Sequence, residues 1–263
     1  IMERAQRRLD ESCKQLQWHN ASASWSKHLD TLACRPLQPV SQGQCTFQNV
    51  DIVVKEVHND LTVYLFGTSE HGESICVTVQ DFYPYFDLLI PPKADQTFLD
   101  ALVKALRKME RDVMHVKLNN MKRIFGYTPD PQTGQPKVEK WARVYMRSSY
   151  SRRRLIRGMG DPSRLLQLLK EQYVFYVMPV IPKGCFEVAG EKLTTEMMFT
   201  ISSKIVPSGW VTVPLTEEKP SHRVSCCQLE TKAKFVEVQP VDRQDIAPIV
   251  TLSFDGECIP TGN

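Results

Sequence analysis

Apolar and polar side chains alternate in three short stretches between residues 47 and 80, and this alternation limits the fold more than any other feature. Side chains two residues apart in a strand point to the same face, so each stretch predicts a half-buried β-strand. Asn59-Asp60 separates the first two stretches and His71-Gly72-Glu73 the last two, and these residue types favour turns. The alternating residues are Val50, Ile52 and Val54, then Leu61, Val63 and Leu65, then Ile75, Val77 and Val79. The sequence predicts a hairpin followed by a third strand.

Helical spacing of apolar residues follows further along the chain. It predicts a helix over residues 95–112, a basic helix at Ser151–Gly158 and another beginning at Asp161-Pro162, where Asp can cap and Pro fits the first turn. Further strands are predicted at Val113–Leu118, Ala142–Met146, Met197–Ile201, Trp210–Val213, Val224–Val238 and Ile249–Phe254. This mixture of helices with mainly antiparallel sheet indicates the α+β class.

The composition narrows the function classes. With 42% apolar and 24% charged residues over 263 positions, the chain can build one large domain or two modest ones. It contains no uninterrupted apolar run of roughly 18 residues, so we expect no membrane partner. The eight cysteines form no Cys-x-x-Cys pair, which argues against zinc fingers and disulfide scaffolds and favours reduced, buried thiols.

Positive charge is concentrated in the middle of the chain. Residues 104–170 hold 17 Lys or Arg against 5 Asp or Glu, whereas the net charge of the whole chain is only +3. Such a band can neutralise phosphates, and aromatic rings within it can stack on bases. The candidate nucleic-acid-binding residues are Lys122, Arg123, Arg152, Arg153, Arg154 and Arg157, and the interleaved aromatics are Phe125, Tyr127, Trp141, Tyr145 and Tyr150. The alternative is a solvated helix face beside ordinary core aromatics.

An acidic pair follows the last predicted strand. Asp255 and Glu257 are two residues apart, so on an extended strand their carboxylates share a face. Two such carboxylates can bind Mg²⁺, and a pair of metal ions can activate water for phosphodiester hydrolysis. The Asp-x-Glu spacing alone occurs by chance in a chain of this composition, so a solvated strand end is the competing interpretation.

Several segments, in order, resemble the N-terminal region of family B DNA polymerases, and in particular their delta-type catalytic subunits. The similar segments are Phe47–Ile52, Val79–Phe86, Ile124–Tyr127, Lys204–Pro214 and Ile246–Cys258. The last is the most specific, because Leu252-Ser253-Phe254-Asp255-Gly256-Glu257-Cys258 is similar to the Leu-Ser-Phe-Asp-Ile-Glu-Cys motif of the family. This resemblance implies that Asp255 and Glu257 are catalytic metal ligands of a 3′→5′ exonuclease.

The resemblance also implies a domain plan. We expect an N-terminal helix and extended lead-in at 1–44, the polymerase N-terminal domain at 45–245, and a truncated exonuclease domain from 246 to 263. The N-terminal domain would combine an RNA-binding-like βαββαβ unit with an oligonucleotide-binding-like barrel and lead into the first strand of an RNase H-like exonuclease domain.

The implied whole protein is a nuclear replicative DNA-directed DNA polymerase, a nucleotidyltransferase with a proofreading exonuclease. Its partners would be template-primer DNA, the remainder of the polymerase chain, and accessory subunits and a sliding clamp bound through regions outside this sequence. The cofactor would be Mg²⁺ in a two-metal exonuclease site of which only part is present.

Two departures keep alternatives open. Gly256 stands where the family has Ile, and a glycine weakens the strand there. The chain also lacks the further exonuclease motifs and the polymerase palm, so we expect the fragment itself to be inactive. The alternatives are a stand-alone single-stranded nucleic-acid-binding module and a polymerase relative whose exonuclease is degenerate.

Overall fold

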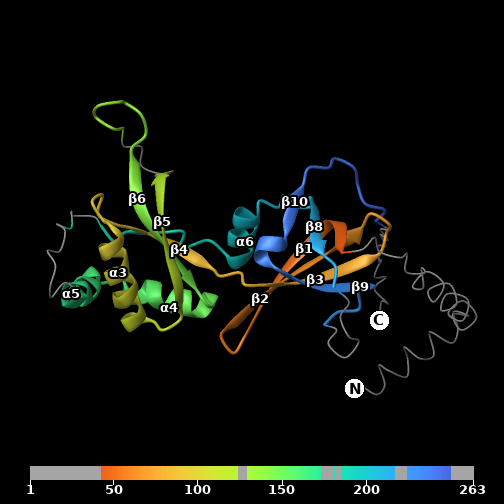
Figure 1. Cartoon of the computed structure of the whole chain (residues 1–263), viewed down its shortest axis with the longest axis horizontal. Helices are drawn as coiled ribbons and strands as arrows, with labels where there is room; N and C mark the ends of the chain where they lie inside the picture. Colours follow the sequence, from red (N-terminus) through yellow and green to blue (C-terminus); the bar gives the residue numbers. More distant parts are fainter. Residues whose placement is uncertain (1–42, 124–128, 173–180, 182–184, 217–223, 250–263) are drawn as a thin grey trace, which may run out of the picture. The chain divides into compact units, whose positions relative to one another are not determined.

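The computed structural model describes residues 43–123, 129–172, 181, 185–216 and 224–249, all within one compact unit, Ser41–Asn263 (Figure 1). These residues form two mainly antiparallel sheets and several helices, which confirms the predicted α+β class. Residues 1–42, the predicted helix and lead-in among them, lie outside the described part. The predicted domain boundaries at 44/45 and 245/246 stay predictions.

The first sheet has six strands in the order β10-β8-β1-β2-β3-β9. The predicted hairpin is confirmed, with Val57 paired to Asp60 around a turn at His58-Asn59, both of which have positive φ angles. Ile75 pairs with Leu229 in a parallel register, whereas the other described strand pairs of this sheet are antiparallel. The strands are β1 (Gln44–Val57), β2 (Asp60–Ser69), β3 (Ser74–Gln80), β8 (Trp210–Pro214), β9 (Leu229–Lys234) and β10 (Gln239–Val241).

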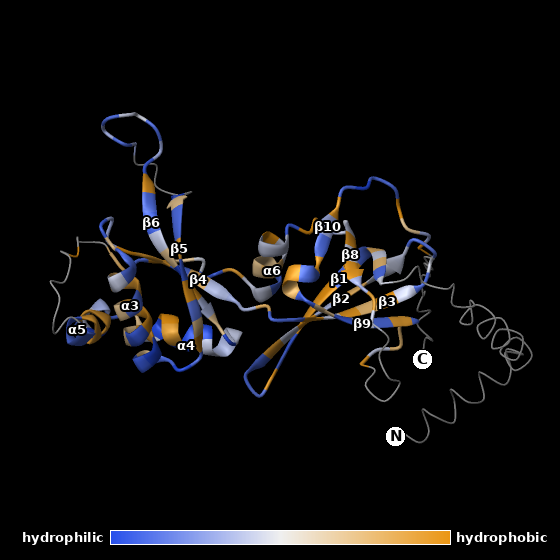
Figure 2. Cartoon of the chain, viewed as in Figure 1, coloured by the Kyte–Doolittle hydropathy of each residue, from blue (hydrophilic) through white to orange (hydrophobic). Residues whose placement is uncertain are grey.

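The core of the six-stranded sheet is formed by the alternating residues that the sequence singles out. Val63, Leu65, Ile75 and Val77 are fully buried together with Phe47. Figure 2 shows hydrophobic stretches along β1, β2 and β3, which are neighbouring strands of this sheet. The predicted periodicity therefore identifies the buried face of β2 and β3 correctly. It is wrong at Val50 of β1, which is 57% exposed beside a register shift between Asn49 and Asp51.

Helix α6 (Thr195–Ser203) packs on this core, and it replaces the predicted strand Met197–Ile201, which is wrong. Thr194 caps the helix by accepting a hydrogen bond from the Met197 amide at 3.2 Å. Phe199 then packs edge-on against Phe82, with ring centroids 5.2 Å apart. The buried positions recur at helical spacing, so packing of Met198 and Phe199 into the core favours a helix over a strand.

The second sheet has four strands in the order β5-β6-β4-β7, with described pairs that are all antiparallel. Its elements follow one another as β4, α3, β5, β6, then α4 and α5, then β7, which is the βαββαβ order that the resemblance implies. The elements are β4 (Tyr85–Leu89), α3 (Gln96–Met109), β5 (Val113–Lys122), β6 (Val138–Met146), α4 (Ser149–Gly158), α5 (Pro162–Gln172) and β7 (Val188–Ala189).

A second core joins this sheet to its helices. Phe86, Leu88, Val144 and Met146 alternate along β4 and β6 and are fully buried against apolar residues of α3, α4 and α5. The opposite residues of the same strands carry the polar face, because neighbouring side chains of a strand point in opposite directions. We call this four-stranded sheet with its three helices the βαββαβ unit.

The βαββαβ unit is inserted between β3 and α6, that is, within the chain of the six-stranded sheet. The tip of the β1–β2 hairpin contacts it. The Glu56 carboxylate accepts hydrogen bonds from the amides of Ser149 at 3.2 Å and Tyr150 at 3.1 Å, so it caps helix α4. Asn59 donates to Asp112 at 2.5 Å and accepts from the Ser148 hydroxyl.

The last third of the chain differs from its prediction in detail. The predicted strand Val224–Val238 is shorter, because only Leu229–Lys234 forms β9 and a 3₁₀ turn follows at Phe235–Glu237. Of the predicted strand Ile249–Phe254, only Ile249 lies within the described residues, and it is not in a strand. Among the helices that the structure describes, none combines the length and the apolar character that crossing a membrane requires.

Candidate nucleic-acid interface

Arg152 lies inside the βαββαβ unit, although the sequence places it in the basic band. Its side chain is buried, with only 4% of the residue exposed. Its Nε donates to the backbone carbonyl of Tyr85 at 2.8 Å, and its guanidinium also donates to the carbonyl of Gly190. Burial, helped by the neighbouring charge of Arg153, lowers the pKa of Arg152 to about 10. These contacts give Arg152 a structural role, and its contact with DNA stays a prediction.

Arg154 connects helix α4 to the end of helix α3. Its Nε and Nη2 reach the two carboxylate oxygens of Glu110 at 2.5 and 2.7 Å, a bidentate pair. The Glu110 side chain is 1% exposed, whereas that of Arg154 is 59% exposed. The hydrogen bond to Glu110 raises the pKa of Arg154. Its charge is thus matched by a buried carboxylate, yet one edge of the side chain faces solvent.

Arg123 directly follows β5 and, like Arg154, is held in ion pairs. Its Nε contacts Glu139 at 2.5 Å and its Nη1 contacts Glu187 at 2.7 Å. The hydrogen bond to Glu139 has the largest effect on the pKa of Arg123 and raises it, and the hydrogen bond to Glu187 raises it further. The guanidinium also lies 5.8 Å from the ring centre of Trp141, which is almost fully buried. Arg123 therefore fastens β6 and the segment before β7 to the end of β5.

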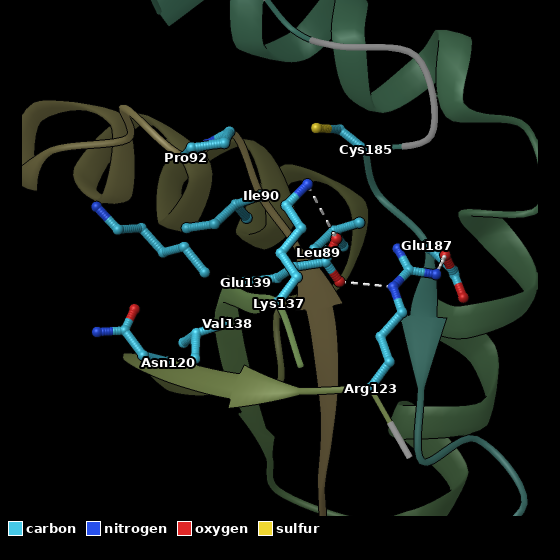
Figure 3. Close-up of a pocket in the computed structure, with 11 residues that line it drawn as sticks. Leu89, Ile90, Pro92, Asn120, Arg123, Lys137, Val138, Glu139, Cys185 and Glu187 are labelled. Atoms are coloured by element: carbon cyan, nitrogen blue, oxygen red, sulfur yellow. Dashed lines mark hydrogen bonds and ion pairs between the residues drawn. The ribbon is translucent and has the colours of Figure 1, made fainter. Parts of the chain in front are cut away.

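A pocket of about 550 Å³ opens beside Arg123, and Figure 3 shows its lining. Two lysines join Arg123 there: Lys137 lies 3.9 Å from Glu139, and Lys140 donates to the carbonyl of Ala94 at 2.8 Å. Apolar residues from the end of β4 complete the wall, Leu89, Ile90 and Pro92 among them. Each cation of the pocket already has an internal partner, so the pocket offers a mixed surface and not a concentrated positive charge.

The remaining three predicted residues differ from the others. Lys122, Arg153 and Arg157 are exposed, and no ion pair joins any of them to another residue in the described ranges. Arg153 makes a single 3.3 Å hydrogen bond to the Ser149 carbonyl. Arg153 and Arg157 are four residues apart on α4, so they lie on one face of the helix. Exposed cations without acidic partners are the ones best able to neutralise phosphates.

The predicted aromatic residues divide in the same way. Tyr150 is 58% exposed beside the α4 arginines, whereas Trp141 is buried in the sheet. Tyr145 stacks on His115 with ring centres 4.1 Å apart. Phe125 and Tyr127 lie outside the described residues. Tyr150 is thus the exposed member of the predicted aromatics that the structure describes, with the Arg154 guanidinium 5.9 Å from its ring centre, and its contact with a base stays a prediction.

Sequence reasoning missed a bidentate ion pair on the polar face of the four-stranded sheet. Arg143 donates from Nε and Nη2 to the two oxygens of Asp87, both at 2.9 Å. The Arg143 guanidinium also stacks over the Tyr85 ring at 4.0 Å. The pair joins directly opposed residues of β4 and β6. Its signal was present in the alternation of the two strands, which places Asp87 and Arg143 away from the apolar core.

The acidic pair lies outside the described residues. This holds for Asp255, Gly256 and Glu257, so the predicted metal site keeps the status of a prediction. Within the described ranges, no group of three or more His, Cys, Asp or Glu residues is arranged to hold a metal ion.

Comparison with known proteins shows which proteins this chain resembles along most of its sequence. The family described as DNA polymerase family B, exonuclease domain, matches residues 190–263. The DNA polymerase of Pyramimonas orientalis virus is 27% identical over 203 residues, covering 74% of this chain and 15% of that protein. The delta catalytic subunits of Dictyostelium discoideum and Bos taurus are 24% and 27% identical and cover 74% and 73% of this chain.

This chain spans 18% and 17% of those two delta subunits, so it corresponds to a small part of each relative. A solved family B DNA polymerase from Pyrobaculum calidifontis aligns with 78% of this chain and 21% of its own, at 16% identity and a TM-score of 0.46. The family match at residues 190–263 and the delta-type relatives along most of the sequence agree with each other. The C-terminal part of the chain is thus similar to the family B exonuclease domain, and most of the chain is similar to the corresponding part of delta-type catalytic subunits.

Proposed function

We propose that this chain is the N-terminal region of a replicative DNA-directed DNA polymerase with a 3′→5′ proofreading exonuclease. The family match carries the proposal, because residues 190–263 include the acidic segment Ile246–Cys258. The delta-type relatives support the polymerase activity of the whole protein. In this proposal the chain binds template DNA and supports the exonuclease domain, while the polymerase palm lies in a part of the protein beyond this sequence.

Asp255 and Glu257 are the proposed ligands for divalent metal ions, with Mg²⁺ as the proposed species. Both carboxylates supply the hard oxygen ligands that Mg²⁺ prefers. When bound, the metal ions would activate a water molecule and stabilise the leaving oxygen during removal of a mispaired 3′ nucleotide. The residues of this chain would supply one part of the site, and the remaining ligands would come from further along the polymerase.

The test is the substitution Asp255→Ala in the full-length polymerase. We expect excision of a single-stranded 3′ end to fall by on the order of 10²-fold, while primer extension is retained. Asp100→Ala is the matched control, because Asp100 is an exposed carboxylate on helix α3, away from the segment that leads to Asp255. An excision rate that is unchanged by Asp255→Ala would remove the metal-ligand role.

If the wild-type polymerase extends primers but does not excise, the alternative of a polymerase relative with a degenerate exonuclease is favoured. Gly256 is the residue that suggests this alternative. A stand-alone binding module predicts a third result, since its natural reading frame would not continue into a polymerase palm. Sequencing the transcript through and beyond Asn263 separates this alternative from the other two.

Lys122, Arg153 and Arg157 are the proposed phosphate contacts of the N-terminal region. Their exposure supports this choice over Arg123, Arg152 and Arg154, whose cationic groups are already engaged within the protein. The wider proposed partners are primer–template DNA, the rest of the polymerase chain, accessory subunits and a sliding clamp. We infer a nuclear location from the eukaryotic delta-type relatives, and immunofluorescence of the tagged protein tests it.

A further inference from the structure

The segment from Gln239 to Ile249 connects the six-stranded sheet to the part of the sequence that contains Asp255. We call this segment the strap. It begins as β10, in which Gln239 pairs with Thr212 and Val241 pairs with Trp210. Beyond β10 it forms no further strand pairing among the described residues, so side chains of the sheet must hold it.

Trp210 holds the middle of the strap. Its ring is buried, and its Nε1 donates to the backbone carbonyl of Asp245 at 2.8 Å. Arg243 covers the ring, with its guanidinium 3.9 Å from the ring centre. A buried indole N–H that finds a carbonyl partner fixes the backbone at that residue, because breaking the bond would leave a polar group unsatisfied.

Arg243 fastens the strap to the β2–β3 turn as well. It forms a bidentate pair with Asp245, at 2.8 and 2.5 Å, and reaches Glu70 at 3.0 Å. The hydrogen bond to Asp245 raises the pKa of Arg243, and the same bond lowers the pKa of Asp245. The guanidinium is therefore held on three sides, by the Trp210 ring and by two carboxylates.

Gln48 holds the end of the strap. This residue is 9% exposed, and its Oε1 accepts a hydrogen bond from the Ala247 amide at 2.9 Å. Its Nε2 donates to the Ser208 carbonyl at 2.8 Å. Only a carboxamide can accept at one end and donate at the other in this way, since a carboxylate has no proton to donate. Gln48 thus joins the strap to the turn that precedes β8.

The backbone beneath Gln48 leaves little freedom. A Cβ atom on Gly67 would lie 2.2 Å from the Gln48 carbonyl oxygen and 2.5 Å from the Phe47 ring. The absence of a side chain at Gly67 therefore allows β2 to approach β1 closely at this point. The side chain of Gln48 projects from a backbone that is packed on its neighbouring strand, so its amide is held in a defined position.

We propose that Gln48, assisted by Trp210, is a positioning residue for the exonuclease: it fixes the point at which the chain leaves the N-terminal sheet toward Asp255 and Glu257. The inference rests on the proposed exonuclease function. Ala247 precedes Asp255 by eight residues, and eight residues span at most roughly 29 Å. Fixing Ala247 therefore limits where the two carboxylates can lie relative to the template-binding region.

The side chain of Gln48 bonds backbone groups of Ser208 and Ala247, and neither partner is one of the predicted cations, so we expect it to act through the strap. Its loss should affect excision more than extension. A misplacement of about 1 Å in a reaction centre can cost on the order of 10²-fold in rate, whereas primer extension uses a palm that the strap does not enter. We therefore expect a change in the ratio of the two activities.

The experiment compares Gln48→Leu, Gln48→Glu and Gln228→Leu in the full-length polymerase. Gln228 is the matched control, because its side chain accepts the Ser74 amide at 3.0 Å on the opposite edge of the same sheet. Gln48→Leu should lower excision of a single-stranded 3′ end by about 10-fold to 100-fold and leave extension within about two-fold. Gln228→Leu should leave the ratio of excision to extension unchanged.

Hydrogen exchange without divalent metal gives a readout that does not depend on activity. Gln48→Leu should remove the protection of the Ala247 amide, and Gln48→Glu should keep part of it, since a carboxylate still accepts that hydrogen bond. Excision by Gln48→Glu should accordingly lie between those of wild type and Gln48→Leu. Equal losses of excision and extension in Gln48→Leu, or normal excision after Ala247 has lost its protection, would overturn the inference.

The two proposals fail in different ways. If Asp255→Ala leaves excision unchanged, the exonuclease function itself is wrong, whatever Gln48 does. If Asp255→Ala abolishes excision while Gln48→Leu does not alter it, the exonuclease function stands and the positioning role of Gln48 is refuted.

Discussion

The Nε of Arg152 donates a hydrogen bond to the backbone carbonyl of Tyr85 at 2.8 Å, so the first arginine of the Arg152-Arg153-Arg154 run points into the protein. Tyr85 begins β4 and Gly190 directly follows β7, and Arg152 bonds the carbonyls of both. A single side chain therefore ties together the first and last strands of the βαββαβ unit.

Replacing Arg152 with Leu should destabilise the protein by about 3 kcal/mol, because two buried carbonyls lose a charged donor. A loss of that size corresponds to a fall in melting temperature of roughly 6–12 °C for a chain of this length. Arg153→Leu, at the exposed neighbour, should change the stability by less than about 0.5 kcal/mol. Equal melting temperatures for the two variants would contradict the structural role of Arg152.

The exposed α4 arginines should govern the salt dependence of DNA binding. The double substitution Arg153→Ala with Arg157→Ala removes two proposed phosphate contacts, so the slope of log affinity for single-stranded DNA against log salt should become shallower by about 1.4. Single-stranded DNA and fluorescence anisotropy at several salt concentrations provide the measurement. Lys192→Ala is the control, because Lys192 is an exposed cation outside residues 104–170. If Lys192→Ala reduced the salt slope as much as the double variant does, DNA binding would depend on the overall positive charge of the protein and not on an interface at α4.

The cap that Glu56 places on α4 should couple the hairpin tip to the βαββαβ unit. Glu56→Ala leaves the amides of Ser149 and Tyr150 without this acceptor and should cost about 1–2 kcal/mol of unfolding free energy. Hydrogen exchange should show faster exchange at the first turn of α4 as well. Glu171→Ala, which breaks only the exposed pair with Lys108, should cost less than about 1 kcal/mol. Unchanged exchange at α4 in Glu56→Ala would argue against the cap.

Thiol chemistry offers a test of the packing of the six-stranded sheet. Burial raises the pKa values of Cys45 and Cys76 to about 11 each. At pH 8 only about one thiol in a thousand would then be the reactive thiolate. Mass spectrometry after brief treatment with iodoacetamide should find Cys226, which is exposed, modified well before the other two. Rapid alkylation of Cys45 in the folded protein would show that the core at β1 opens readily.

The regular parts of the fold were predictable because their patterns are long and repeat locally. The β1–β2 hairpin and helix α3 each contain several apolar residues at one consistent spacing, and both predictions are confirmed. Met197–Ile201 is only five residues long, and a short apolar run fits a buried strand as well as a buried helix. The cap at Thr194 contained the missing information, since a threonine before such a run favours a helix start.

The six basic residues could be found from the sequence, but their separate roles could not. Adjacent residues of a helix point about 100° apart, so three consecutive arginines of a packed helix have different environments. Ser148, Arg152, Leu155 and Met159 are buried at intervals of three and four residues, and this interval was readable in advance. Glu187, a partner of Arg123, is 64 residues away in the sequence, and Glu110, the partner of Arg154, is 44 residues away. Only the tertiary structure brings these pairs together.

The parallel pairing of β3 with β9 has a consequence for how the chain is made. Ser74 and Gln228, at the start of this pairing, are separated by 154 positions. At translation rates of roughly 5–20 residues per second, β3 leaves the ribosome about 8–30 s before its partner strand exists. The βαββαβ unit can fold completely during that interval, whereas β1, β2 and β3 wait with an unpaired edge. Among the described elements, the six-stranded sheet therefore waits longest for its last strand, and the edge of β3 is open to mispairing during that time.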